Sequence, residues 1–124
     1  MGIFDTLFGE SSKNNNSDLW IEINNFMDLE KAIDKSFKQK VAIFKHSTRC
    51  GISTRVKAKF EKEMEEFKPK VILYYLDLLA HRDISNSIAE KFSITHQSPQ
   101  LLVLENGKVI QHASHSDITS NLFS

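Results

Sequence analysis

The chain has one cysteine, Cys50, and its type and position suggest chemistry more directly than any other residue. It follows an apolar, strand-like run and a short polar loop, and it precedes an apolar stripe at helical spacing. This order predicts a sulfur at the start of a helix, where backbone N–H groups and the helix dipole favour the thiolate. The thiolate is the nucleophilic form of cysteine, so Cys50 is the candidate nucleophile of a thiol reaction. The alternative is a free cysteine that begins a helix without reacting.

The first helical turn after Cys50 predicts how the sulfur is supported. With Cys50 as the N-cap, the sulfur is expected to accept hydrogen bonds from the N–H groups of Ile52 and Ser53. Ser53 stands where C-x-x-C redox proteins have a second cysteine, and serine cannot close an internal disulfide. A mixed disulfide at Cys50 must therefore be resolved by an outside thiol. The Ser53 hydroxyl is expected either to donate to the thiolate or to belong to an ordinary first turn, and both roles can hold at once.

The loop before Cys50 carries further polar side chains. Lys45 and Arg49 are expected to place positive charge near the sulfur, and His46 is expected to order the loop or to tune the thiol. Thr48 and Arg49 can contact a small thiol that carries carboxylates, because a guanidinium offers paired donors. The alternative for an exposed arginine is simple solvation.

A metal site is disfavoured by the spacing of the candidate ligands. His46, His96 and His115 could join Cys50, but no pair shows H-x-x-x-H spacing and no carboxylate completes a set. A single cysteine forms no internal disulfide and no cysteine-rich metal site. It fits a reducing, cytoplasmic compartment.

The composition bounds the remaining possibilities. The 124 residues fit one domain, and 40% hydrophobic residues can build one ordinary core. Sixteen basic and sixteen acidic residues cancel, so charge gives no indication of nucleic acid or of an anionic membrane as a partner. No apolar run approaches the ~20 residues of a membrane-spanning helix, and no signal peptide is expected. Residues 1–18 are expected to form an apolar turn and a flexible polar linker, and residues 19–124 the folded domain.

Hydrophobic periodicity and turn residues predict an α/β chain. Strands are expected at 20–23, 41–44, 71–76, 100–104 and 109–112, and helices at about 27–38, 52–67 and 84–92. Pro69 is expected to end the second helix, and Asn106-Gly107 predicts a hairpin. A short last helix containing Ile118 is expected, capped by Ser116 or Asp117. Right-handed crossovers make the first strands parallel, so the expected architecture is a mixed central sheet with helices on both faces.

This order of elements resembles the thioredoxin fold. The motifs are similar to those of the monothiol bacilliredoxin family, a YtxJ-like group of bacillithiol-linked redox proteins. The matching segments are IFKHSTRCGIS at 43–53, SPQ at 98–100 and HASHSDIT at 112–119. The resemblance extends from about residue 20 to the C-terminus. Gly51 stands where the family usually has proline, and Ser116 stands where it often has an aromatic residue.

The resemblance implies a monothiol thiol-disulfide oxidoreductase. In this interpretation the Cys50 thiolate removes bacillithiol from S-bacillithiolated client proteins, with bacillithiol as a thiol co-substrate and with no bound cofactor or metal. The resemblance also implies a cis peptide bond before Pro99, which would face Cys50 and aim the Ser98 backbone at a substrate. A cytoplasmic monomer is expected. The residues expected to support Cys50 are His46, Thr48, Arg49, Gly51, Ile52, Ser53, Ser98 and Pro99.

Two other functions remain open on the sequence. A non-catalytic thioredoxin-like module would bind protein partners through the groove at Pro99. A stress sensor would have Cys50 capped by small thiols, without transfer from clients. The sensor and the oxidoreductase share the same cysteine, so the sequence does not separate them.

Overall fold

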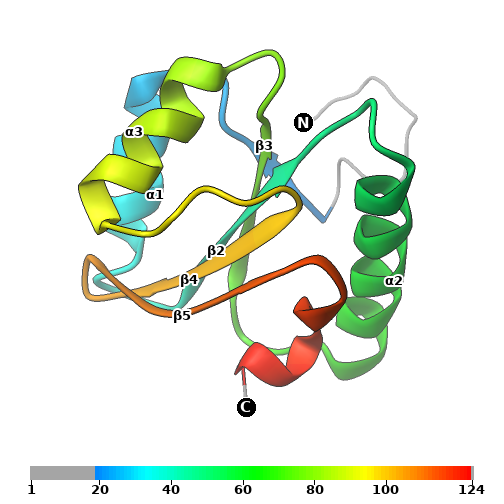
Figure 1. Cartoon of the computed structure of the whole chain (residues 1–124). Coiled ribbons are helices and arrows are strands. Elements are labelled where there is room, and N and C mark those ends of the chain that lie inside the picture. Colours follow the sequence, from blue (N-terminus) through cyan, green and yellow to red (C-terminus); the bar gives the residue numbers. More distant parts are fainter. Residues whose placement is uncertain (1–18, 124) are drawn as a thin grey trace, which may run out of the picture.

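A five-stranded mixed sheet forms the centre of the computed structural model, which describes residues 19–123 (Figure 1). The expected apolar turn and linker of residues 1–18 lie outside the described residues. The strand order in the sheet is β1-β3-β2-β4-β5. The strands are β1 (Ile21–Glu22), β2 (Val41–His46), β3 (Ile72–Asp77), β4 (Gln100–Glu105) and β5 (Lys108–Ser114).

The strand directions confirm the expected topology. β3 is parallel to both β1 and β2, whereas β4 is antiparallel to β2 and to β5. β4 and β5 form a hairpin at one edge of the sheet. Its turn has positive φ at Asn106 (56°) and Gly107 (77°), the conformation that an Asn-Gly hairpin turn requires.

Three helices cover the two faces of the sheet (Figure 1). α1 (Phe26–Lys35) and α3 (Arg82–Phe92) pack on one face, and α2 (Gly51–Phe67) packs on the other. Alternate residues of β2 supply the two cores: Val41 and Ile43 face α1 and α3, whereas Ala42 and Phe44 face α2. All six residues of β2 are buried, as expected for a central strand covered on both sides.

The ends of α2 follow from local chemistry. Cys50 is its N-cap, and Lys68, with φ of 43°, is its left-handed C-cap. Pro69 follows directly, and a residue before proline is disfavoured in the α region, so the helix ends where the proline predicts. The helix has 17 residues, which places its two ends about 25 Å apart.

The expected single helix at the C-terminus is wrong. Two 3-10 turns, η3 (His115–Asp117) and η4 (Ser120–Phe123), stand in its place. Ile118 lies between them in an extended conformation and is 1% exposed in the core beneath α2. Burial of this side chain interrupts the helical conformation that the local pattern favours. The Ser120 N–H then donates to Glu63 Oε1 (2.8 Å), which ties η4 to α2.

Candidate thiol site

Cys50 lies at the junction between the loop that leaves β2 and the first turn of α2. Its backbone is extended (φ −105°, ψ 118°), and its N–H donates to the Ser47 carbonyl oxygen (3.2 Å). The thiol is free and the residue is partly buried. A strand, a tight turn and a helix start therefore place the single thiol of the chain just beyond the carboxyl-terminal end of β2, the middle strand of the sheet.

The predicted N-cap position of Cys50 is confirmed, but the predicted hydrogen bonds of its sulfur are wrong. The Cys50 side chain makes no capping hydrogen bond to α2. A thiol sulfur is only a weak acceptor, so little holds it over the first N–H groups of the helix. The sulfur is thus not engaged with the Ile52 or Ser53 N–H group.

The hydroxyl of Ser53 serves the scaffold instead of the thiol. Ser53 is fully buried, and its Oγ lies 2.7 Å from His46 Nδ1 and accepts a hydrogen bond from the Ser47 N–H (3.2 Å). Within the described residues the hydroxyl proton of Ser53 has no acceptor other than His46 Nδ1, so the hydroxyl donates to that nitrogen. The expected donation from Ser53 to the Cys50 thiolate is not found, because the same proton is used by His46.

His46 is a buried, neutral side chain that joins β2 to α2. It is the last residue of β2 and only 6% exposed. Burial lowers the pKa of His46 from its ordinary value of 6.5; the Lys57 charge lowers it further, while Asp77 and Glu61 oppose the shift. A neutral ring can accept the Ser53 proton at Nδ1, so burial and the hydrogen bond favour the same protonation state. The ring thus contacts the first turn of α2 through Ser53, and its effect on the thiol stays a prediction.

The expected contribution of Lys45 to the charge around the thiol is wrong. Lys45 is fully buried and projects to the face covered by α1 and α3, opposite to its neighbour His46. Its Nζ donates to the Ser85 carbonyl oxygen (3.1 Å) and lies 3.3 Å from His96 Nδ1. Successive residues of a strand point to opposite faces, so one of this pair had to turn away from α2.

The side chains directly around Cys50 are open to solvent. Thr48, Arg49, Gly51 and Ile52 are all exposed, and Ile52 is 56% exposed despite its apolar side chain. An exposed cation and an exposed apolar group beside a free thiol form an accessible rim. Gly51 is the first residue of α2, and a side chain added there would meet no atom within 4 Å.

Ser98 and Pro99 lie at the same end of the sheet as the Cys50 loop. The bond between them is cis, as the resemblance implies. Gln100 pairs with Lys45 in the β2–β4 register, which places the two residues before it at the end of β2 from which the Cys50 loop leaves. Pro99 is buried, and its carbonyl oxygen accepts a hydrogen bond from the His115 N–H (3.1 Å).

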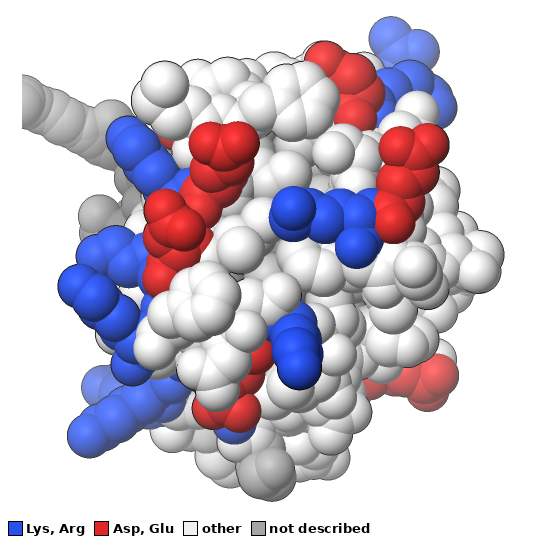
Figure 2. Space-filling view, turned by 90° about the vertical axis from the view of Figure 1, so that its left-hand side faces the viewer, with Lys and Arg blue, Asp and Glu red and all other residues white. Residues whose placement is uncertain are grey.

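A metal ion, a charged partner and a membrane would each require particular features of the described residues. Within residues 19–123, no group of three or more His, Cys, Asp or Glu side chains is placed to hold a metal ion. Acidic and basic side chains are interspersed over the side that carries α1 and α3 (Figure 2). No helix of the described part combines the length and apolar character that crossing a bilayer requires.

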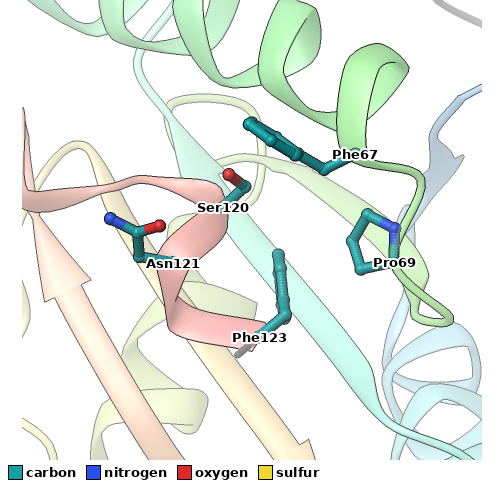
Figure 3. A pocket seen from close by; sticks show the side chains of 5 residues that line it. All are labelled: Phe67, Pro69, Ser120, Asn121 and Phe123. Atoms are coloured by element: carbon teal, nitrogen blue, oxygen red, sulfur yellow. The ribbon is translucent and has the colours of Figure 1, made fainter.

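A pocket of about 200 Å³ lies at the far end of α2 from Cys50 (Figure 3). Phe67 and Pro69 border it on one side, and Ser120 and Phe123 of η4 border it on the other. The length of α2 separates this pocket from the sulfur, so it takes no part in the thiol site.

The fold and the site together define a thioredoxin-like protein with one cysteine at the start of a helix. A solved protein with a thioredoxin fold is similar over 85% of this chain and 90% of its own, with 30% identity and a TM-score of 0.74. Thioredoxin O2 from Arabidopsis thaliana (14% identity, 80% of this chain and 84% of its own, TM-score 0.63) shares the fold. So does a thioredoxin from Malassezia sympodialis (18% identity, 80% of each chain, TM-score 0.62).

The family described as monothiol bacilliredoxin BrxC matches residues 21–122. The chain therefore belongs to the monothiol bacilliredoxin family, and this membership supports a thiol redox function.

Proposed function

We propose that this protein is a monothiol thiol-disulfide oxidoreductase that removes bacillithiol from S-bacillithiolated proteins. The observation that carries the proposal is the free thiol of Cys50 at the N-cap of α2, with a buried serine three residues later, in a member of the monothiol bacilliredoxin family. A buried structural cysteine does not need this position. A nucleophile does, because this position sets the thiol among the exposed residues Thr48, Arg49, Gly51 and Ile52, where a substrate can reach it.

The proposed reaction consists of two successive thiol-disulfide exchanges with no net oxidation. The Cys50 thiolate attacks the bacillithiol sulfur of the mixed disulfide. A new S–S bond forms between Cys50 and bacillithiol, the old S–S bond breaks, and the client cysteine leaves as a thiolate that takes a proton from water. A second bacillithiol then attacks the Cys50 mixed disulfide, which releases bacillithiol disulfide and restores the Cys50 thiolate.

The environment of Ser53 supports the monothiol course of this reaction. A second cysteine at this position would compete for the mixed disulfide, whereas the Ser53 hydroxyl is buried and hydrogen-bonded to His46 and to the Ser47 N–H. The exposed rim of Thr48, Arg49, Gly51 and Ile52 is then the proposed contact surface for bacillithiol and client, with Ser98 and Pro99 on the neighbouring loop. The carboxylates of bacillithiol would pair with the Arg49 guanidinium.

The proposed setting is the cytoplasm, with the protein acting as a monomer. Its partners are bacillithiolated client proteins and bacillithiol itself, and the mechanism uses no bound cofactor.

The test is intact-mass spectrometry of reduced protein mixed with a bacillithiolated client, beside Cys50→Ala. We expect wild type to gain the mass of one bacillithiol while the client loses it, and Cys50→Ala to leave the client unchanged. A glutathionylated form of the same client, run in parallel, measures the preference for the thiol.

Two outcomes would favour the other functions. Rapid modification of Cys50 by bacillithiol disulfide without transfer from the client would indicate a sensor. Absence of both reactions, with slow alkylation of Cys50, would indicate a binding module.

A further inference from the structure

A cluster of four polar side chains, three of them buried, lies on the face of the sheet opposite to α2, at the end near Cys50. We call Lys45, Ser85, His96 and Gln100 the Lys45 cluster. Lys45, Ser85 and Gln100 are at most 2% exposed, whereas His96 is an exposed residue of the loop of residues 93–99 whose Nδ1 faces Lys45 and Ser85. The cluster joins β2, α3, that loop and β4, and the thiol reaction described above uses none of its members.

The hydrogen bonds of the cluster converge on His96 and its loop. His96 Nδ1 lies 3.3 Å from Lys45 Nζ and 3.3 Å from Ser85 Oγ. Gln100 Nε2 donates to the Thr95 carbonyl oxygen (3.0 Å). The loop held in this way leads directly into Ser98 and Pro99.

Burial of Lys45 at this position costs free energy of hydration. Its Nζ has a carbonyl oxygen and a neutral ring nitrogen as partners, and within the described residues no carboxylate pairs with it. Burial lowers its pKa to about 8. An apolar side chain of similar length would avoid the loss of hydration that a buried cation suffers. Stability therefore does not explain the lysine.

The position of Lys45 on β2 suggests what it does. Lys45 and His46 are adjacent and project to opposite faces of the sheet. His46 contacts Ser53 in the first turn of α2 (2.7 Å), and Lys45 contacts His96 in the loop of residues 93–99 (3.3 Å). The end of one strand is thus linked both to the first turn of α2 and to the loop that leads into Pro99.

We propose that Lys45 is a positioning residue for thiol exchange at Cys50, because it holds the loop of residues 93–99 against the end of β2 and so keeps Ser98 and Pro99 in place for the client disulfide. This inference rests on the proposed function and deepens it. Lys45 acts through His96 and does not touch the reacting sulfur atoms.

The test compares Lys45→Met with wild type in three measurements: removal of bacillithiol from the client, alkylation of Cys50 by iodoacetamide, and urea unfolding. Loss of the charge-assisted hydrogen bond between Lys45 and His96 in the loop predicts about tenfold slower removal. Alkylation by a small reagent does not need the loop and stays unchanged. The unfolding midpoint stays equal or rises, because the buried cation is gone.

Two further variants separate positioning from packing. Ile43→Met, two residues earlier on the same face of β2, changes the packing without reaching the loop, and we expect wild-type exchange. His96→Ala removes the acceptor through which Lys45 contacts the loop, so adding Lys45→Met in that background should slow exchange little further.

Equal exchange by wild type and Lys45→Met would overturn the inference. A parallel fall of exchange, alkylation and stability would also overturn it, because it would show a merely structural role. If wild type itself removes no bacillithiol, the proposed function fails and this inference fails with it, a result distinct from the first two.

Discussion

Replacing Ser53 with alanine removes one oxygen atom that serves two partners. His46 Nδ1, on a side chain that is 6% exposed, loses its donor at 2.7 Å, and the Ser47 N–H loses its acceptor at 3.2 Å. A buried polar atom left without a partner costs about 1–3 kcal/mol. The better helix propensity of alanine returns about 0.5 kcal/mol. We expect Ser53→Ala to lower the free energy of unfolding by about 1–2 kcal/mol, which corresponds to a Tm lower by about 4–8 °C in a domain of this size.

Thermal and urea unfolding followed by circular dichroism measure this loss. The matched control is Thr54→Ala, one residue later in the same turn. The Thr54 side chain is exposed and its hydroxyl donates to the Cys50 carbonyl oxygen (3.1 Å). An exposed change of this kind stays within about 0.5 kcal/mol. If both variants unfold at the same temperature and urea concentration as wild type, the hydrogen bond between His46 and Ser53 does not stabilise the fold, and the structural role assigned to Ser53 is refuted.

Three further predictions concern protonation and backbone conformation. Burial is the main cause that lowers the pKa of both His46 and His96 below 6.5 in the folded state. As the pH drops below 6.5, the unfolded chain therefore takes up protons first, and the free energy of unfolding falls. Urea midpoints at several pH values measure this fall, and His46→Gln should make it shallower. The pKa of Lys45 is about 8 in the folded protein and 10.5 ordinarily. Between these two pH values the unfolded chain binds more protons, so the free energy of unfolding rises with pH, by roughly 1 kcal/mol per pH unit near pH 9. Lys45→Met should lack this slope. Gly107→Ala should cost about 1–2 kcal/mol in urea unfolding, because φ is +77° there; the contact of its Cβ with Phe37 Cζ at 2.6 Å adds less, since the exposed ring can move.

Each of these predictions has a result that contradicts it. An acid decline of equal steepness in His46→Gln would mean that His46 is not kept neutral by the fold. An identical alkaline slope in Lys45→Met would mean that Lys45 titrates normally. Wild-type stability of Gly107→Ala would mean that the hairpin turn adapts to a side chain.

Local patterns in the sequence were sufficient to predict most of the architecture. The continuous apolar runs at β2 and β3 indicated central strands, Asn106-Gly107 indicated the hairpin, and the cysteine after β2 indicated the start of α2. These signals depend on residues close together in the chain, and each agrees with the element that forms. The C-terminal segment is the exception, because burial of Ile118 against α2 outweighs the local preference for a helix.

The details of the site required tertiary contacts. β2 is buried on both faces, so its sequence shows no alternation that would tell which way Lys45 points. Its direction follows from the sheet register and from the carbonyl oxygen of Ser85 on α3, forty positions away. The role of the Ser53 hydroxyl is likewise decided by competition between partners, since one proton cannot serve both His46 and the thiolate.

The amino-acid sequence therefore determined that a single thiol stands at the junction of a central strand and a helix, because strand, turn and helix propensities are local properties. The tertiary structure alone decided which side chains surround the site and which are used to hold it. Neighbours from α3, from the loop of residues 93–99 and from β4 come together with Lys45 only when the sheet forms. Hydrogen bonding and burial at those long-range contacts are not encoded in any single stretch of the chain.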